Sequence, residues 1–574
     1  MPSAVRARDQ TAIDGVAPGL LPLPSIELDQ KHVLTRHDET TNRPICESLP
    51  FALAGGVTIG GASASEVRGG QQDGPSGRTG ERAADLVARR IWSHSESGHT
   101  ADLVARRIWR VTVTLSRVSV PMEELMASNR PKQPLWGRET ELALANFPVS
   151  GQPLPIEIVH ALAAIKADAA IVNRAHATSD EQRTRLTAIH DAATAVEDGA
   201  HDEQFQIDIF QTGSGTSTNM NVNEVVAHLA AESCGLAVHP NDDVNASQSS
   251  NDTFPTATTI ATVLMLRRSV LPAVATLTDS LVAAAQRFAD VVKAGRTHLM
   301  DAVPLFLGDE FSGYAAQLRE SSERIESSLA RIGRVPLGGT AVGNGLNAPP
   351  DFGGQVIARL AARYGIDLSV APSRFAAQAS RDNLVEASSH LRGLAVALLK
   401  IANDIRLMGS GPATGLGELR LPELQAGSSI MPGKVNPVMC EMVTQVCAQV
   451  LGNDHTIAFA GSQGAFELNT YQPVIAANIV ASMRLLTQAC TLFAERCVDG
   501  LEADVERCRI HAGSTPALAT GLNELLGYDH VSKIVKQAVA QRRPLIDVVL
   551  EDGNVDPQTA AVALDPVRVA KGNR

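Results

Sequence analysis

The 574-residue chain is poor in aromatic residues: phenylalanine, tryptophan and tyrosine together make up 3% of it. Aromatic and β-branched side chains favour strands, whereas alanine, which is plentiful here, favours helix. The rest of the composition, 44% hydrophobic and 20% charged, is that of an ordinary globular protein. The sequence therefore predicts a mainly α fold.

Cysteines are few, and none has the close spacing of a metal-binding or redox pair. The seven cysteines are dispersed and include no Cys-x-x-Cys motif. This pattern indicates neither a disulfide framework nor a zinc or iron–sulfur cluster, so we expect no metal, no organic cofactor and a reducing compartment. Cys440 and Cys447 are seven residues apart, as are Cys490 and Cys497, which predicts that each pair is buried on one helix face.

Long uncharged apolar runs are also missing. Residues 48–65 lack charge but are rich in Gly, Ala and Ser, and they begin too late for a signal peptide. The net charge is −12, and the first 122 residues carry 14 basic and 13 acidic side chains, so the remainder carries −13. An acidic body argues against non-specific binding to nucleic acid or membranes. We therefore expect a cytoplasmic protein with neither kind of partner.

Residues 1–122 differ from the rest of the chain. They lack apolar periodicity and are rich in Pro, Gly and Ser, which predicts disorder. Within them, residues 84–92 recur word for word as residues 101–109. Two copies are too few for a solenoid. A basic helix that binds a partner is one interpretation; we prefer a short duplication in an unselected extension, or a start codon placed too far upstream.

Helical periodicity begins at Ile156 and is clearest over residues 381–408. Two apolar rows with heptad spacing run through that segment: Leu384, Leu391, Leu398 and Ile405, and then Ala387, Leu394, Ile401 and Met408. They predict a helix about 40 Å long. With the apolar patterns of residues 255–288, 304–331 and 437–451, they predict a bundle of long helices. Because a lone subunit could not cover so many apolar faces, we expect a homotetramer.

Residues 427–437, Gly-Ser-Ser-Ile-Met-Pro-Gly-Lys-Val-Asn-Pro, are here named the serine loop. They precede a helix expected to start at Pro437 with Asn436 as its N-cap. A helix N-terminus offers unpaired N–H groups and a positive dipole end, and the serines and lysine add donors. The serine loop is therefore predicted to bind an anion, most simply a carboxylate. An ordinary Gly/Ser surface loop would explain the glycines but not the Lys-x-Asn at the helix start.

Three further stretches are short, polar and placed before an expected helix. They are residues 211–216, residues 239–252 and residues 295–302. Each offers N–H groups and Ser, Thr or Asn donors to an anion. Taken singly, each is an ordinary capping sequence. Four such stretches in one chain point to a binding site.

In this order, the four stretches resemble the signature regions of the class II, iron-independent fumarases of the fumarase/aspartase superfamily. The similarity covers roughly residues 135–535. It implies a three-domain fold with a central long-helix bundle: residues 123–251, residues 252–503 and a small helical domain over residues 504–574, after the extension 1–122. It also implies reversible hydration of fumarate to L-malate through an aci-carboxylate intermediate, at sites that combine loops from different subunits.

The resemblance implies roles for individual residues. Ser428 is the base, His298 holds and polarises the water, and Glu441 is the partner of His298 in a charge relay. The residues implied to grip the two substrate carboxylates are Ser214, Gly215, Thr216, Ser249, Ser250, Asn251, Thr297, Ser429, Lys434, Val435 and Asn436. A second, non-catalytic dicarboxylate site is implied at His239, Pro240, Asn241 and Asp242. Relatives often carry a basic residue shortly before that site, and residues 235–238 contain none.

Two alternatives remain, an aspartate ammonia-lyase and a catalytically inactive helical scaffold. Aspartate ammonia-lyases typically have Gly-Ala-Gly-Thr where residues 213–216 are Gly-Ser-Gly-Thr, and a histidine in place of Asp243. Argininosuccinate and adenylosuccinate lyases usually have a bulkier residue at Gly433. An inactive scaffold predicts loss of Ser428, His298 or Lys434, all of which are present. These differences favour a fumarase.

Overall fold

The computed structural model describes residue 131 and residues 133–572. These residues belong to one compact unit, Val118–Arg574. The disorder expected for residues 1–122 and the repeated segments 84–92 and 101–109 fall outside the described residues. Those expectations therefore stay predictions.

The described chain is mainly helical, as the composition predicted. In its first part α5 packs against α6, and α6 packs against α7. The bounds are α4 Arg138–Asn146, α5 Ile156–Arg174, α6 Asp180–Glu197, η1 Asp202–Gln204, α7 Thr216–Cys234 and η2 Pro240–Val244. The periodicity expected from Ile156 onwards is confirmed, because the apolar residues that recur at spacings of three and four are all buried: Ile158, Leu162, Ile165, Ala169 and Val172.

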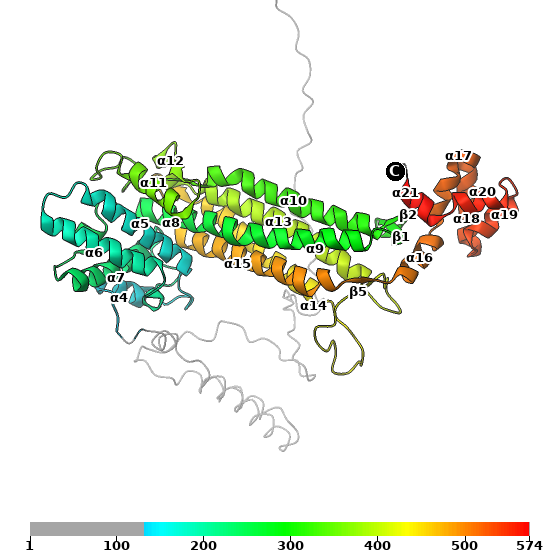
Figure 1. Ribbon diagram of the computed structural model, residues 1–574, viewed down its shortest axis with the longest axis horizontal. Coiled ribbons are helices and arrows are strands. Elements are labelled where there is room, and N and C mark those ends of the chain that lie inside the picture. The colour runs from blue at the N-terminus through cyan, green and yellow to red at the C-terminus, as the bar shows by residue number, and fades with distance from the viewer. Residues whose placement is uncertain (1–130, 132, 573–574) are drawn as a thin grey trace, which may run out of the picture. The chain divides into compact units, whose positions relative to one another are not determined.

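Long helices lie side by side in the centre of this unit (Figure 1). α10 packs against α9 and α13, while α14 packs against α13 and α15. The bounds are α8 Ser250–Met265, η3 Leu266–Val270, α9 Leu271–Arg287, α10 Leu307–Ile332, α13 Asp382–Met408, α14 Val438–Gly461 and α15 Gln472–Arg496. The predicted bundle of long helices is confirmed.

Both apolar rows of α13 are buried, as their heptad spacing predicted. The argument that a lone subunit could not cover them is wrong, however. α10, α14 and α15 of the same chain pack against α13 and cover its seam. The seam therefore says nothing about the number of subunits.

The remaining elements are short strands and helices, and every sheet in the described residues has two strands. The bounds are β1 Val292–Thr297, β2 Met300–Phe306, β3 Arg334–Val335, α11 Phe352–Tyr364, β4 Ser369–Val370, α12 Arg374–Ala379, β5 Leu419–Arg420, β6 Gly464–Ala465, β7 Leu468–Asn469, η4 Val498–Gly500, β8 Glu502–Ala503, α16 Val505–Ser514, η5 Pro516–Leu522, α17 Asn523–Leu526, α18 Tyr528–Gln541, α19 Leu545–Asp552, α20 Pro557–Ala563 and α21 Pro566–Lys571. A large core spans Trp136 to Cys508, and a small one spans Leu518 to Leu564. The division into three domains remains a prediction.

Three helices begin elsewhere than the sequence predicted. α8 starts at Ser250 rather than Pro255, because Ser249 caps it together with Asp252. Pro304 does not begin a helix but lies within β2, and α10 follows at Leu307. α14 starts at Val438, one residue after the expected position.

Two helical stretches are long and apolar enough to cross a membrane by length and composition alone, Ser250–Arg287 and Gln472–Gly500. About half of each apolar window is buried inside the chain. The core helices of soluble proteins pass the same test, so this is weak support for a membrane protein.

The cysteines with heptad spacing are buried, as predicted: Cys440, Cys447, Cys490 and Cys497. All are free thiols. Burial raises the pKa of Cys447 and that of Cys490 to about 12. Such thiols stay protonated and act as small apolar side chains.

Candidate functional site

Six of the predicted binding residues lie where α7 and α8 begin: Ser214, Gly215, Thr216, Ser249, Ser250 and Asn251. The Thr216 hydroxyl lies 2.7 Å from the Ser214 hydroxyl and 2.7 Å from the Ser250 hydroxyl. Gly215 is the N-cap of α7, with φ +75°, and an added Cβ would lie 2.1 Å from the Phe254 ring. Only glycine fits this turn, because it tolerates the left-handed conformation and leaves room for Phe254. Ser214, Thr216 and Ser250 are named here the hydroxyl cluster.

A buried carboxylate, that of Asp252, lies two residues after Ser250 of the hydroxyl cluster. Asp252 accepts hydrogen bonds from the backbone N–H groups of Ser249, Gly338 and Thr340, each at 2.9 Å. Burial raises the pKa of Asp252 to about 6, against the opposing effect of these donors. Asp252 thus joins the start of α8 to the Gly338–Thr340 turn. This role of Asp252 was not predicted, although the Ser-x-x-Asp spacing of a capping box is visible in the sequence.

A buried lysine on α5 belongs to the same region. Lys166 is fully buried and donates to Asn245 Oδ1 at 2.7 Å. Burial lowers the pKa of Lys166 to about 7, and the charge of Asp252 opposes this shift. The burial of Lys166 was not predicted either. Its signal is a lysine among apolar residues in the middle of α5.

The serine loop folds back on itself before α14. The Asn436 side chain donates to the Gly427 carbonyl at 2.7 Å, which closes the loop. Asn436 is therefore not the predicted N-cap, because its side chain is engaged in this closure. The Ser428 Oγ accepts the N–H groups of Ile430 at 3.1 Å and Met431 at 3.0 Å. These donors would stabilise negative charge on that oxygen.

The other predicted residues of the serine loop lie close to Ser428 in the chain. Ser429, Lys434 and Val435 are exposed. Glu441 is exposed in the first turn of α14. A cation, N–H donors and hydroxyls at the tip of one helix are groups suited to a carboxylate.

His298 lies in the turn of a hairpin rather than in a loop before a helix, which corrects the sequence prediction. Thr297 of β1 pairs with Met300 of β2, so His298 and Leu299 form a two-residue turn. Their φ values are +57° and +59°. Such turns favour Asn-Gly, because other residues pay about 1–2 kcal/mol each for the left-handed conformation. Thr297 and His298 are exposed. Residues 297–300 are named here the His298 turn.

The hydroxyl cluster lies too far from the His298 turn and from the serine loop to meet either of them in one chain. A continuous helical stretch of 38 residues, Ser250–Arg287, leads from the hydroxyl cluster towards the His298 turn, a span of about 55 Å. α14, with 24 residues, spans about 35 Å between the serine loop and the other end of the bundle. At that end the Gln472 N–H donates to the Gly213 carbonyl, beside the hydroxyl cluster. Among the described residues, His298 forms no hydrogen bond with Glu441.

The residues predicted for a second dicarboxylate site lie together on the short helix η2 and just before it. His239 accepts the Asp242 N–H on its Nδ1 at 3.1 Å, and Asp243 accepts the His239 N–H at 2.8 Å. Arg185 of α6 donates to the Ala237 carbonyl at 3.4 Å, so a cation lies near the segment that has none in its sequence. The two aspartates oppose binding of a dianion. A second site stays a prediction.

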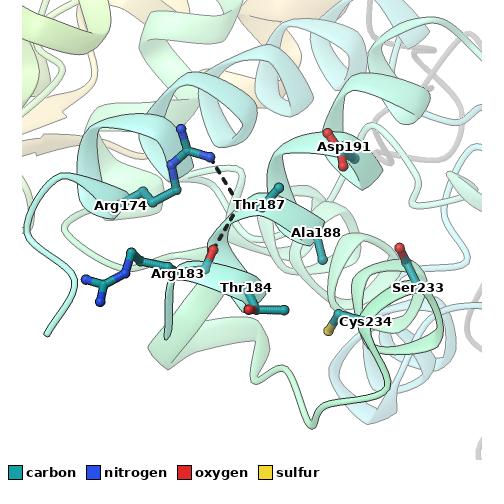
Figure 2. A pocket seen from close by; sticks show the side chains of 8 residues that line it. All are labelled: Arg174, Arg183, Thr184, Thr187, Ala188, Asp191, Ser233 and Cys234. Atoms are coloured by element: carbon teal, nitrogen blue, oxygen red, sulfur yellow. Dashed lines mark hydrogen bonds between the residues drawn. The ribbon is translucent and has the colours of Figure 1, made fainter. Parts of the chain in front are cut away.

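A surface pocket of about 450 Å³ opens between α5, α6 and α7 (Figure 2). Arg174 donates to the Thr187 hydroxyl at 3.1 Å in its wall. The pocket contains none of the predicted site residues.

Among the described residues, no cluster of three or more His, Cys, Asp or Glu side chains could hold a metal ion. The absence of a cofactor remains a prediction.

Comparison with known proteins shows the family to which this chain belongs. The Lyase family model matches residues 126–452, and the model described as Fumarase C C-terminus matches residues 518–571. A fumarate hydratase class II from Mycobacterium tuberculosis is 52% identical over 436 residues, which are 76% of this chain and 91% of that protein. Its counterpart from Corynebacterium efficiens is 51% identical over 427 residues, 74% and 90% of the two chains.

A solved structure gives the same result. The recombinant class II fumarase from Schistosoma mansoni superposes with a TM-score of 0.75 at 37% identity and covers 77% of this chain and 97% of that one. The fold and the polar helix tips define a lyase of the fumarase/aspartase superfamily. Within that superfamily, the chain belongs to the class II fumarate hydratases.

Proposed function

We propose that this chain catalyses the reversible, stereospecific hydration of fumarate to L-malate, the step of the tricarboxylic acid cycle between these dicarboxylates. The observation that carries the proposal is the Ser428 Oγ, which accepts two backbone N–H groups in a loop that also holds Lys434. Its support is the chain's identity with class II fumarate hydratases over most of their length.

In the direction from malate to fumarate, the first step removes a proton from the carbon beside one carboxylate. This C–H acid is very weak, so the base must be strong and the resulting charge must be stabilised. Ser428 acts as an alkoxide, stabilised by the Ile430 and Met431 N–H groups and by Lys434. The electron pair left on carbon moves into the adjacent carboxylate and gives the aci-carboxylate dianion.

In the second step the hydroxyl group leaves from the neighbouring carbon. His298 gives it a proton on the opposite face, so that water departs and the electron pair forms the double bond. Glu441, from a neighbouring chain in the assembled site, orients His298. The hydroxyl cluster, together with Ser249, Asn251 and Thr297, binds the substrate carboxylates. Ser429, Lys434 and Asn436 bind them from the serine loop.

The proposal includes a homotetramer in which each site is shared between subunits. Residue groups separated by about 35–55 Å in one chain can meet only if chains pack with opposite ends together. A two-fold axis achieves this for two chains, and two such pairs close into a tetramer. Exposed apolar side chains on α13 and α14 support such packing: Val396, Leu407 and Phe459. Light scattering that shows an active monomer would contradict it.

The enzyme is proposed to work in the cytoplasm, without a cofactor and without a nucleic-acid or membrane partner. Six cysteines of the described region are free thiols, which supports a reducing compartment. The net charge of −12 supports the absence of nucleic-acid binding.

Purified protein tests the reaction directly. We expect the ultraviolet absorbance of fumarate to fall when fumarate is added and to rise when L-malate is added, in buffer treated with a chelator. L-aspartate is the control substrate. Deamination of aspartate at a comparable rate would favour the ammonia-lyase alternative, and no turnover of any of the three would favour an inactive scaffold.

A further inference from the structure

The His298 turn needs a support that its own sequence does not supply. His298 and Leu299 both adopt the left-handed conformation that glycine or asparagine would adopt more easily. Both are exposed in the single chain, so no packing of their own side chains within that chain holds the turn. Within the chain, the conformation is therefore imposed by the two strands.

A buried charged group holds β1 immediately before the turn. Glu418 is fully buried, and its two carboxylate oxygens accept hydrogen bonds from the two terminal nitrogens of Arg296, at 2.9 and 2.6 Å. Arg296 lies two residues before His298 and pairs with Asp301 across the hairpin. Such a two-point contact fixes the direction of the guanidinium as well as its distance.

Other parts of the fold hold Glu418 itself. His511 of α16 donates its Nδ1–H to Glu418 Oε1 at 2.9 Å, and Lys293 Nζ lies 3.7 Å from Oε2. The Glu418 N–H donates to the Met408 carbonyl at the end of α13. Burial alone would raise the pKa of Glu418, but the hydrogen bonds from Arg296 and the charge of Lys293 keep it below its usual value. The group is therefore an anion fixed to the bundle and to α16.

We propose that Glu418 is a positioning residue for the reaction: through Arg296 it fixes the His298 turn at the angle from which His298 reaches the substrate. This inference rests on the role given to His298 in the proposed function. Glu418 lies within the chain's own core and does not contact the substrate. An irregularity in the ladder between Ala294 and Gly295 supports the assignment, because such bulges redirect the strand that follows.

Glu418→Gln tests the inference, since it keeps the size of the side chain but turns an NH₂ group towards a cationic donor. We expect kcat to fall roughly 10-fold to 100-fold, the effect of a reacting group displaced by about 1 Å, with KM little changed. Asp168→Asn is the matched control. Asp168 is equally buried and accepts hydrogen bonds from Arg359 and Arg363, far from the hairpin in the chain. It should lower the melting temperature without lowering kcat.

A double-mutant cycle separates positioning from a general structural role. If Glu418 acts through His298, Glu418→Gln should lower kcat no further in a His298→Asn background. An equal fold-loss in both backgrounds would overturn the inference, as would wild-type kcat in Glu418→Gln alone. His298→Asn with full kcat would instead refute the proposed role of His298, and this inference with it. If Glu418→Gln does not fold, Arg296→Lys replaces it, and wild-type kcat in that variant would refute the inference.

Discussion

Replacing Gly215 with alanine should disturb both the stability of the chain and its binding of substrate. Gly215 has φ +75°, and its Cβ would lie 2.1 Å from the ring of Phe254, a fully buried side chain on α8. Because Phe254 is fully buried, the clash should displace α8, and Ser250 lies one helical turn before Phe254. The substitution should therefore shift Ser250 and disturb the hydroxyl cluster.

The expected magnitude follows from two separate costs. The left-handed conformation costs alanine about 1–2 kcal/mol relative to glycine, and overpacking in a core costs about 1–3 kcal/mol more. Gly235, at the other end of α7, isolates the first cost. It has φ +70°, but an added Cβ there meets no atom within 4 Å. Gly235→Ala should therefore lose only the conformational part.

Urea unfolding followed by circular dichroism, at one protein concentration, measures the stabilities. KM for fumarate measures the state of the hydroxyl cluster. We expect Gly215→Ala to be about 1–3 kcal/mol less stable than Gly235→Ala, and only Gly215→Ala to raise KM. Equal losses in the two variants, with unchanged KM in both, would refute the geometric reasoning about Phe254.

Three further predictions concern other parts of the chain. Ser428→Ala should lower kcat roughly 10²-fold or more with little change in KM, whereas Lys434→Ala should impair both, and steady-state kinetics distinguishes them. Deleting residues 1–121 should leave activity and melting temperature nearly unchanged, and lost folding would show that the extension is structural. The lowered pKa of Lys166 means that the folded chain loses a proton near pH 7 while the unfolded chain keeps it until about 10.5. Stability should therefore rise with pH in that window, and Lys166→Met should remove the rise in urea melts at pH 6.5 and 9.

The long helices could be predicted from the sequence because the buried face of a helix makes apolar residues recur at regular spacing. Each predicted apolar position of α13 is buried, since a helix packed along its length repeats its contacts every heptad. What the period cannot show is which elements cover the seam. Helices of the same chain do so here, and the subunit count drawn from that seam had no basis.

The hairpin that carries His298 could not be predicted, for a different reason. Its first strand, β1, contains Lys293 and Arg296, whose partner Glu418 is more than a hundred residues away, so this strand does not show the alternation of a half-buried strand. Its turn has His-Leu where turn rules expect Asn-Gly. Local rules fail where distant contacts impose the conformation. The hydroxyl cluster, by contrast, was predictable because helix caps are local.

The separation of the site groups leads to a prediction about mixed assemblies. Thr216→Val damages the hydroxyl cluster, and Ser428→Ala damages the serine loop, so each variant alone should be nearly inactive. Suppose that every site takes its hydroxyl cluster from one chain and its serine loop from another. In a randomly mixed assembly, some sites then take the hydroxyl cluster from a Ser428→Ala chain and the serine loop from a Thr216→Val chain, so both groups are intact. With equal amounts of the two variants, the chance that the hydroxyl cluster of a site is intact is one half, and so is the chance that its serine loop is intact. Both groups should therefore be wild type in about one quarter of the sites. Co-expression of the two variants with different affinity tags, purification through both tags and assay of fumarate hydration measures this fraction. A mixed assembly as inactive as its parents would mean that one chain supplies both groups, which helices about 35–55 Å long do not allow.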